Sequence, residues 1–258
     1  MKYMRLFFAA FVIITCACDK DPQVLPKQEP KTDTLAKCVL KFNAQAADQN
    51  LKFGNEIWYK NVQGDSFTVS KFNYFISNIK LYTDSVNYKK ISDVYLLVKH
   101  HISKQQFTVN TAIQGTFSAM EFLIGVDSLR NISGAQTGDL DPGNDMFWDW
   151  TTGYIFYKLE GMYKNQTTYP AREYAIHIGG FQGRYSCLQR VRLSFSKPLV
   201  LKHGYKSQIT LQTQLDEVFK TPYSIGFDDY YNDVTLPMFQ NLSQNYSDMF
   251  RIQEILNP

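Results

Sequence analysis

The sequence lacks the short motifs that define several common classes of protein. It contains no C-x-x-C pair, which disfavours a thiolate metal site, and its four histidines show neither His-x-His nor His-x-x-x-His spacing. Gly-x-Ser-x-Gly, phosphate-binding glycine loops and dinucleotide-binding fingerprints are also absent. Asp149 and Glu160 could form the acid–base pair of a glycosidase, but carboxylates are too common for this to carry weight. We therefore expect a protein that is not an enzyme.

The sequence also has little excess of either charge. It holds 27 Lys and Arg against 24 Asp and Glu, and no long basic run occurs. A nucleic-acid-binding protein would show a concentrated basic patch. We therefore expect no nucleic-acid partner.

Long hydrophobic runs are missing apart from one near the start of the chain. This run covers residues 6–17 and is too short to span a bilayer, which needs about 20 residues. It follows the two positive charges of Lys2 and Arg5. The pattern is typical of a secretory signal peptide, which we place at residues 1–17.

The residues that follow the signal indicate a lipid anchor. Ala17 directly before Cys18 resembles the lipobox of bacterial lipoproteins, in which the cysteine is lipidated and becomes the mature N-terminus. Cys16 is a poorer alternative anchor, and an ordinary cleaved signal peptide is the other interpretation. Residues 18–36 are rich in proline and charge and are predicted to form a flexible tether. We expect lipid attachment to the bacterial outer membrane, with the protein facing the periplasm or the cell surface.

Beyond the tether, short runs of alternating apolar and polar residues recur between turn residues. Such runs are typical of strands, and with scarcely any helical periodicity between them they predict a single all-β domain over residues 37–258. We expect an antiparallel β-sandwich with Greek-key-like connections. The predicted strands cover residues 37–45, 65–72, 74–83, 94–100, 115–125, 153–161, 172–180, 188–196 and 204–213.

The pattern changes near the C-terminus. In residues 238–256 large apolar residues recur three and four positions apart. This spacing predicts one or two short helices that close the fold.

Two cysteines remain for the folded domain, Cys38 and Cys187. In an oxidising compartment they could form one disulfide. Two separate buried thiols are the alternative, because the sequence does not show whether the two residues are close together.

The segment "GDLDPGND", residues 138–145, is rich in oxygen-bearing side chains. Its Pro142-Gly143 pair suits the centre of a type II turn. A calcium loop of the EF-hand kind would need an acidic residue at its twelfth position, where this chain has Trp150. A solvated turn is therefore favoured over a calcium site.

The next segment, "MFWDW", places large side chains at alternate positions. If it is extended, Met146, Trp148 and Trp150 project to one face, and Phe147 and Asp149 to the other. The first three could fill a core, or they could line a pocket for a soft metal such as Cu(I), which favours thioether and imidazole donors.

The histidines are the better metal donors, but their spacing alone favours structural roles. His177 is the strongest candidate, because it lies on a predicted strand and is followed by two glycines that permit close approach. His100 and His101 are adjacent and would face opposite ways on a strand. His203 lies at a predicted hairpin turn.

Several segments together resemble the MbnP-like family of exported copper-binding proteins, and the lipobox with its Pro-rich tether resembles Bacteroidetes members in particular. The resemblance covers most of residues 38–255. The matching segments are "FNYFISNIKLY" (72–82), "GTFSAMEFLIGVDSLRN" (115–131), "GDLDPGNDMFWDWTTGYIFYKLEG" (138–161), "YAIHIGGF" (174–181) and "NYSDMFRIQEI" (245–255).

This resemblance implies a copper ion held by histidine and by kynurenine, an oxidised tryptophan made by a dihaem peroxidase-like (MbnH-like) partner enzyme. Carried over to this chain, the tryptophan is Trp148 or Trp150, and the histidine is His177. The second ligand stays open among His101, His203 and Met146. The implied role is copper acquisition or storage.

A metal-free alternative has to be weighed against copper binding. Two aromatic-rich segments, "MFWDW" (146–150) and "GFDDYYND" (226–233), could instead bind a glycan or a protein.

Overall fold

The computed structural model describes residues 34–258, which belong to one compact unit. The predicted signal peptide, the Cys18 anchor and nearly all of the tether lie outside the described residues. No helix among the described residues has the length and apolar character needed to cross a membrane.

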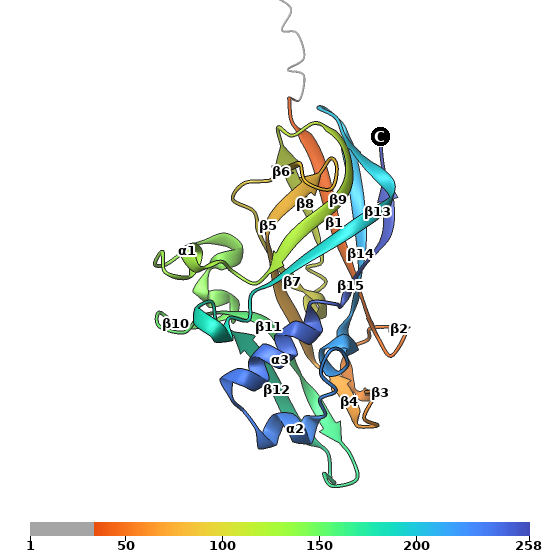
Figure 1. Ribbon diagram of the computed structural model, residues 1–258. Helices are drawn as coiled ribbons and strands as arrows, with labels where there is room; N and C mark the ends of the chain where they lie inside the picture. Colours follow the sequence, from red (N-terminus) through yellow and green to blue (C-terminus); the bar gives the residue numbers. More distant parts are fainter. Residues whose placement is uncertain (1–33) are drawn as a thin grey trace, which may run out of the picture. The chain divides into compact units, whose positions relative to one another are not determined.

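The described residues adopt the predicted all-β fold, built from two sheets (Figure 1). The smaller sheet has the order β15-β14-β1-β2, with β8 also paired to β1. Its one parallel pair is β1 with β14, in which Phe42 lies opposite Leu211. The bounds are β1 (Ala36–Ala46), β2 (Gln49–Asn50), β8 (Gln106–Thr111), β14 (Lys206–Gln214) and β15 (Phe250–Leu256).

The larger sheet has the order β13-β9-β5-β11-β4-β3 and is antiparallel throughout. Strands β6 and β7 also pair with β5, and β10 and β12 pair with β11. The bounds are β3 (Gly54–Lys60), β4 (Ser66–Val69), β5 (Lys71–Tyr82), β6 (Tyr88–Lys90), β7 (Tyr95–Lys99), β9 (Gly115–Ile124), β10 (Phe147–Asp149), β11 (Gly153–Lys164), β12 (Arg172–Gly179) and β13 (Gln189–Leu201).

Aromatic side chains join the two sheets. Phe42 of β1 meets the ring of Tyr74 of β5 edge-on at 6.0 Å, and Phe250 of β15 meets Phe122 of β9 at 5.0 Å. All four are at most 1% exposed. Because burial of each large apolar side chain contributes about 1.5–3 kcal/mol, these contacts hold the sheets face to face.

Short helices connect and cover the sheets. They are α1 (Ser128–Asn131), α2 (Phe227–Asn232) and α3 (Leu236–Tyr246), with 3-10 turns η1 (His100–Ile102), η2 (Gly138–Leu140), η3 (Pro142–Asn144), η4 (Gly183–Tyr185) and η5 (Leu215–Phe219). Figure 1 shows α2 and α3 beside β12.

The C-terminal region corrects one expectation. The helical pattern predicted over residues 238–256 ends with α3, and β15 follows it. The edge of β14 needs a partner for its backbone groups, and β15 supplies it in antiparallel register. The aromatic-rich segment 226–233, considered as a binding surface for a glycan or a protein, contains α2, which buries Phe227 and Tyr230.

Cys38 and Cys187 are two separate free thiols, both 1% exposed. The disulfide alternative is therefore wrong, and the alternative of two buried thiols holds. Burial raises the pKa of each thiol to about 12.

We expect both thiols to resist iodoacetamide in the folded protein at pH 8, because the reactive thiolate is almost absent and the sulfurs are buried. The ordinary thiol pKa is 9.0. Their contribution to stability is therefore complete below about pH 9 and declines as the pH rises toward 12. Peptide mass mapping, with urea-unfolded protein as the control, checks this. Rapid labelling of either residue in the folded protein would contradict it.

Candidate metal site

A row of polar residues crosses four neighbouring strands of the larger sheet. Asn73 of β5 lies opposite Lys99 of β7 and Lys158 of β11, and Lys158 lies opposite His177 of β12. Residues directly opposite in antiparallel strands share a face, so these four side chains point the same way. Asn73 and Lys158 are nearly inaccessible, at 1% and 2% exposure. The row therefore buries polar groups that need partners.

A loop that contains η2, η3 and β10 supplies several of those partners. The Asp145 carboxylate lies 2.9 Å from the Lys71 ammonium and 3.0 Å from that of Lys158. Lys158 also donates to the Asp145 backbone oxygen, and Lys99 donates to that of Asn144 at 2.9 Å. Burial of the Asp145 carboxyl acts to raise its pKa, but hydrogen bonds from the two lysines outweigh it and the pKa falls to about 2. Asp145 therefore stays ionised and fastens the loop to the sheet.

The turn chemistry of this loop differs from the prediction. Gly143 lies in the 3-10 turn η3, and the left-handed conformation falls on Asp145, with φ of 63°. Other oxygen atoms of the loop have protein partners: Asp139 accepts from the Leu97 amide at 2.8 Å, and Asp141 from the Gly143 amide at 2.8 Å.

Glu160 orients the ring of His177. His177 Nε2 lies 2.8 Å from Glu160 Oε1, and the other carboxylate oxygen lies 3.2 Å from the Lys71 ammonium. Burial lowers the pKa of His177, partly offset by the Glu160 hydrogen bond. Within residues 34–258, His177 Nδ1 makes no hydrogen bond. The neutral ring therefore offers one nitrogen to a ligand.

The loop brings Trp148 and Met146 to the same face as His177. A Cβ placed on Gly179, two residues after His177, would lie 2.6 Å from Trp148 Cζ3, so only glycine leaves room for this ring. Met146 is 1% exposed, and its sulfur lies 3.8 Å from the Asn73 amide nitrogen. Imidazole, indole and thioether thus gather along one stretch of the sheet.

Trp150 does not lie on this face of the sheet. The prediction that Trp148 and Trp150 project to the same face is therefore wrong. The Asp149 carboxylate accepts from the Thr151 and Thr152 amides at 2.7 and 2.8 Å, and this turn redirects the chain. The Trp150 ring packs against Phe147 at 4.8 Å and is 58% exposed.

The other histidines divide into one near the site and two elsewhere. His101 lies two residues after Lys99 of the row, and its ring meets that of Phe53 edge-on at 6.4 Å. Burial lowers its pKa, and its buried Nδ1 has no hydrogen-bond partner among the described residues. His100 stacks on Phe72 at 5.1 Å in the core, where burial lowers its pKa to about 4.

His203 lies in the turn between β13 and β14, where its Nε2 donates to the Ala112 carbonyl at 3.0 Å. Figure 1 shows this turn at the end of the fold away from β10 and β12. The structure therefore removes His203 from the candidate ligands.

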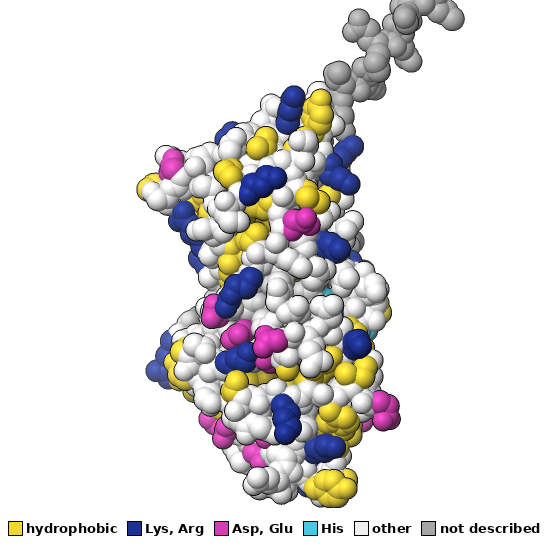
Figure 2. Space-filling view, turned by 90° about the vertical axis from the view of Figure 1, so that its right-hand side faces the viewer, with side chains coloured by type: hydrophobic (Ala, Val, Ile, Leu, Met, Phe, Trp, Pro, Cys, Tyr) yellow, Lys and Arg dark blue, Asp and Glu magenta, His cyan; other side chains and the backbone are white. Residues whose placement is uncertain are grey.

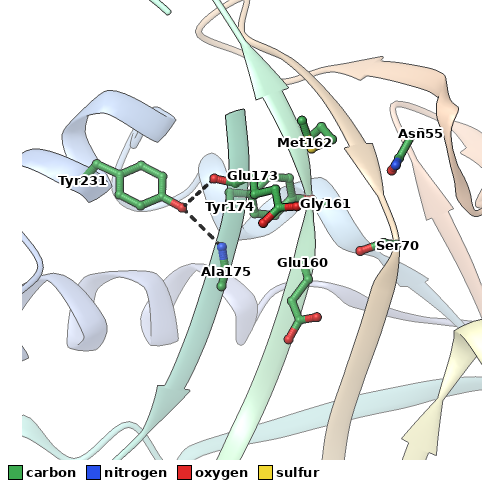
Figure 3. Close-up of a pocket in the computed structure, with 9 residues that line it drawn as sticks. All are labelled: Asn55, Ser70, Glu160, Gly161, Met162, Glu173, Tyr174, Ala175 and Tyr231. Atoms are coloured by element: carbon green, nitrogen blue, oxygen red, sulfur yellow. Dashed lines mark hydrogen bonds between the residues drawn. The ribbon is translucent and has the colours of Figure 1, made fainter. Parts of the chain in front are cut away.

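Glu160 also borders an open pocket of about 440 Å³ (Figure 3). Met162 and Glu173, opposite each other on β11 and β12, line it with Tyr231 of α2. The Tyr231 hydroxyl lies 3.2 Å from the Ala175 amide and 3.4 Å from the Glu173 carbonyl. The pocket gives solvent access to the Glu160 end of the site.

Sequence reasoning missed the two lysines of this cluster, Lys71 and Lys158. A signal for the second exists, because Lys158 interrupts an otherwise apolar strand, "GYIFYKLEG". Within the part of the chain that the structure describes, no three His, Cys, Asp or Glu side chains converge as a metal site. Any metal held here must therefore also use a thioether, an amide or a modified indole.

The fold and this cluster define an all-β protein in which one carboxylate-oriented histidine shares a sheet face with a tryptophan and a buried methionine. The chain belongs to the MbnP family, whose model matches residues 36–242. It is also similar to a solved structure, MbnP from Methylosinus trichosporium, with 13% identity and a TM-score of 0.47 over 74% of this chain and 80% of that one. No match was found among curated proteins.

Proposed function

We propose that this protein is an exported copper-binding protein, held at the cell envelope by a lipid on Cys18, with a non-enzymatic role in copper acquisition or storage. Its membership of the MbnP family supports a copper-associated role. The observation that carries the proposal is the arrangement of His177: Glu160 holds its Nε2, its Nδ1 has no hydrogen-bond partner among the described residues, and Trp148 and Met146 lie on the same face of the sheet.

The hydrogen bond between His177 Nε2 and the Glu160 carboxylate is of the kind that metal-binding histidines make. Such a histidine usually bonds a carboxylate or carbonyl through the nitrogen that does not face the metal, which fixes the ring. Two buried atoms near the row, Asn73 Oδ1 and His101 Nδ1, have no hydrogen-bond partner among the described residues. Buried polar atoms without partners are costly, so a ligand that satisfied them would be stabilised.

The charges around the site favour a monovalent ion. The ammonium groups of Lys71 and Lys158 balance the carboxylates of Asp145 and Glu160, so the cluster has no excess of negative charge to hold a dication. Thioether and imidazole are donors that suit Cu(I). Copper would therefore be held as Cu(I) by His177, with Met146 and His101 as the further candidates.

Trp148 is the tryptophan that would supply another donor after oxidation to kynurenine. Indole is a poor metal ligand, whereas kynurenine carries a ketone and an aromatic amine. Trp148 lies beside Gly179 on the His177 face and is 41% exposed, so a modifying partner enzyme of the dihaem peroxidase class could reach it. Trp150 points elsewhere, against Phe147.

The proposal is tested by the copper content of protein isolated from its native host grown with copper, because the tryptophan-oxidising partner has to be present. We expect about one copper ion per chain, together with a peptide that carries a kynurenine at position 148. Protein from copper-starved cells is the control. Copper-free native protein would contradict the proposal and leave glycan or protein binding as the alternative.

A further inference from the structure

A second cavity, of about 490 Å³, opens on the outer face of the smaller sheet beside η1. Its lining contains no Lys, Arg, Asp or Glu, and burial lowers the pKa of the two histidines that line it, His100 and His101, which favours their neutral form. Figure 2, which shows the β14–β15 side of the molecule, has a middle region coloured mostly white, for uncharged polar side chains and backbone. The cavity is lined by six side-chain amides, those of Asn43, Gln45, Asn50, Gln105, Gln212 and Gln253.

The alternation of two strands builds this surface. On β1, Phe42 points into the core and Asn43 and Gln45 outward, while on β14 Leu211 is buried and Gln212 lies opposite Asn43. Because the side-chain period of a strand is two residues, the outward positions of both strands carry amides on one face.

The amides are held by one another and keep spare hydrogen-bonding capacity. Asn43 Nδ2 donates to Gln253 Oε1 at 2.8 Å, and Gln212 donates to Gln45 Oε1. Among the described residues, Asn43 Oδ1, Gln212 Oε1 and Gln253 Nε2 make no hydrogen bond. The cavity thus presents fixed donors and acceptors that are already oriented.

We propose that this cavity binds an uncharged sugar unit of a glycan. Each sugar hydroxyl both donates and accepts, as amides do, and the uncharged lining offers nothing to offset the desolvation of an ionic ligand. Phe53 and Leu51 also line the cavity and provide apolar surface for one face of a sugar ring. The volume lies within the range of small-molecule sites, about 300–1,000 Å³.

A peptide added as a strand would fit this place poorly. The floor of the cavity is the face of β1 and β14, whose backbone groups already pair with each other and with their neighbours β2, β8 and β15. A strand-forming peptide needs a free sheet edge. The ligand must therefore be recognised by side chains, as a sugar would be.

The test is calorimetric titration of the purified full-length protein with maltotetraose, cellotetraose and chitotetraose. We expect at least one to bind, and Gln212→Leu to weaken that binding by at least about tenfold. Gln208→Leu is the matched control, because Gln208 lies on the same face of β14 but outside this cavity, and it should leave binding unchanged. If Gln212→Leu does not fold, Gln212→Asn replaces it in the titration, because asparagine keeps the amide on a shorter side chain.

Two results would overturn the proposal: binding of none of the three sugars, or equal loss in the Gln212 and Gln208 variants. Copper content of the same variants separates this site from the copper site. His101, a further candidate copper ligand, also lines this cavity. Gln212 lies on the other sheet from His177, the main ligand of the proposed copper site, so we expect the copper content to be unchanged.

Discussion

Replacing His177 by alanine is expected to lower the affinity for Cu(I) by at least about a hundredfold, because it removes the one histidine that a carboxylate orients toward the tryptophan face. The fold should persist. The side chain is partly exposed, and Glu160 keeps its ion pair with Lys71 after the imidazole is removed. The expected loss in free energy of unfolding is about 1 kcal/mol or less. Competition against a chromogenic Cu(I) chelator measures the affinity.

Two further variants test whether the loss of Cu(I) affinity is specific to the proposed site. His203→Ala is the control, because His203 lies in the β13–β14 turn and should leave copper binding unchanged. Glu160→Gln should weaken binding by about 10- to 100-fold, since the ring of His177 would lose its charged partner. Unchanged affinity in His177→Ala would refute the assigned site. Loss of affinity that only follows unfolding would point to a packing role.

Gly161→Val is expected to lower the free energy of unfolding by about 3 kcal/mol or more. A Cβ at this position would lie 2.1 Å from the Thr68 backbone oxygen, well inside van der Waals contact. The neighbour cannot move aside easily, because β4 is paired with β11 and the Tyr174 hydroxyl donates to the same oxygen at 2.8 Å. Strand β11 would have to shift, and Glu160 with it.

Gly134→Ala separates the effect of space from that of backbone conformation. Gly134 has φ of 80° but no atom within 4 Å of an added Cβ. Its substitution should therefore cost about 1 kcal/mol, from backbone strain alone. Urea unfolding followed by circular dichroism compares the two variants. Equal costs would show that strand contact at Gly161 is not the cause.

Local alternation was enough to predict the long strands but not the short or ambiguous ones. The predicted strand at 115–125 agrees closely with β9 (Gly115–Ile124). The closing strand β15 was taken for helix, because its apolar residues fit either period, and only the unpaired edge of β14 decides between them. Strand β3 was missed because polar side chains on both of its faces obscure the alternation. Strand β8 was also missed, although Phe107 and Val109 alternate there with polar residues.

The candidate site could be predicted in part. His177, Met146 and Trp148 stood out by residue type, and the structure brings them to one face of the sheet. Sequence spacing could not rank His203 below His101, because a histidine in a turn and one beside the site look alike until the chain folds. The turn at Asp149 that separates the two indoles depends on side-chain hydrogen bonds that alternation does not encode.

By itself, the sequence determined the all-β class and the clustering of tryptophan and methionine, because these follow from side-chain period and from neighbours along the chain. Only the tertiary structure decided that Lys71, Asp145, Lys158, Glu160 and His177 meet, and that Cys38 and Cys187 do not. Those meetings depend on the register of β5, β11 and β12 and on the left-handed turn at Asp145. A shift of one residue in any of these pairings would turn every side chain of that strand to the opposite face, and the site would not form.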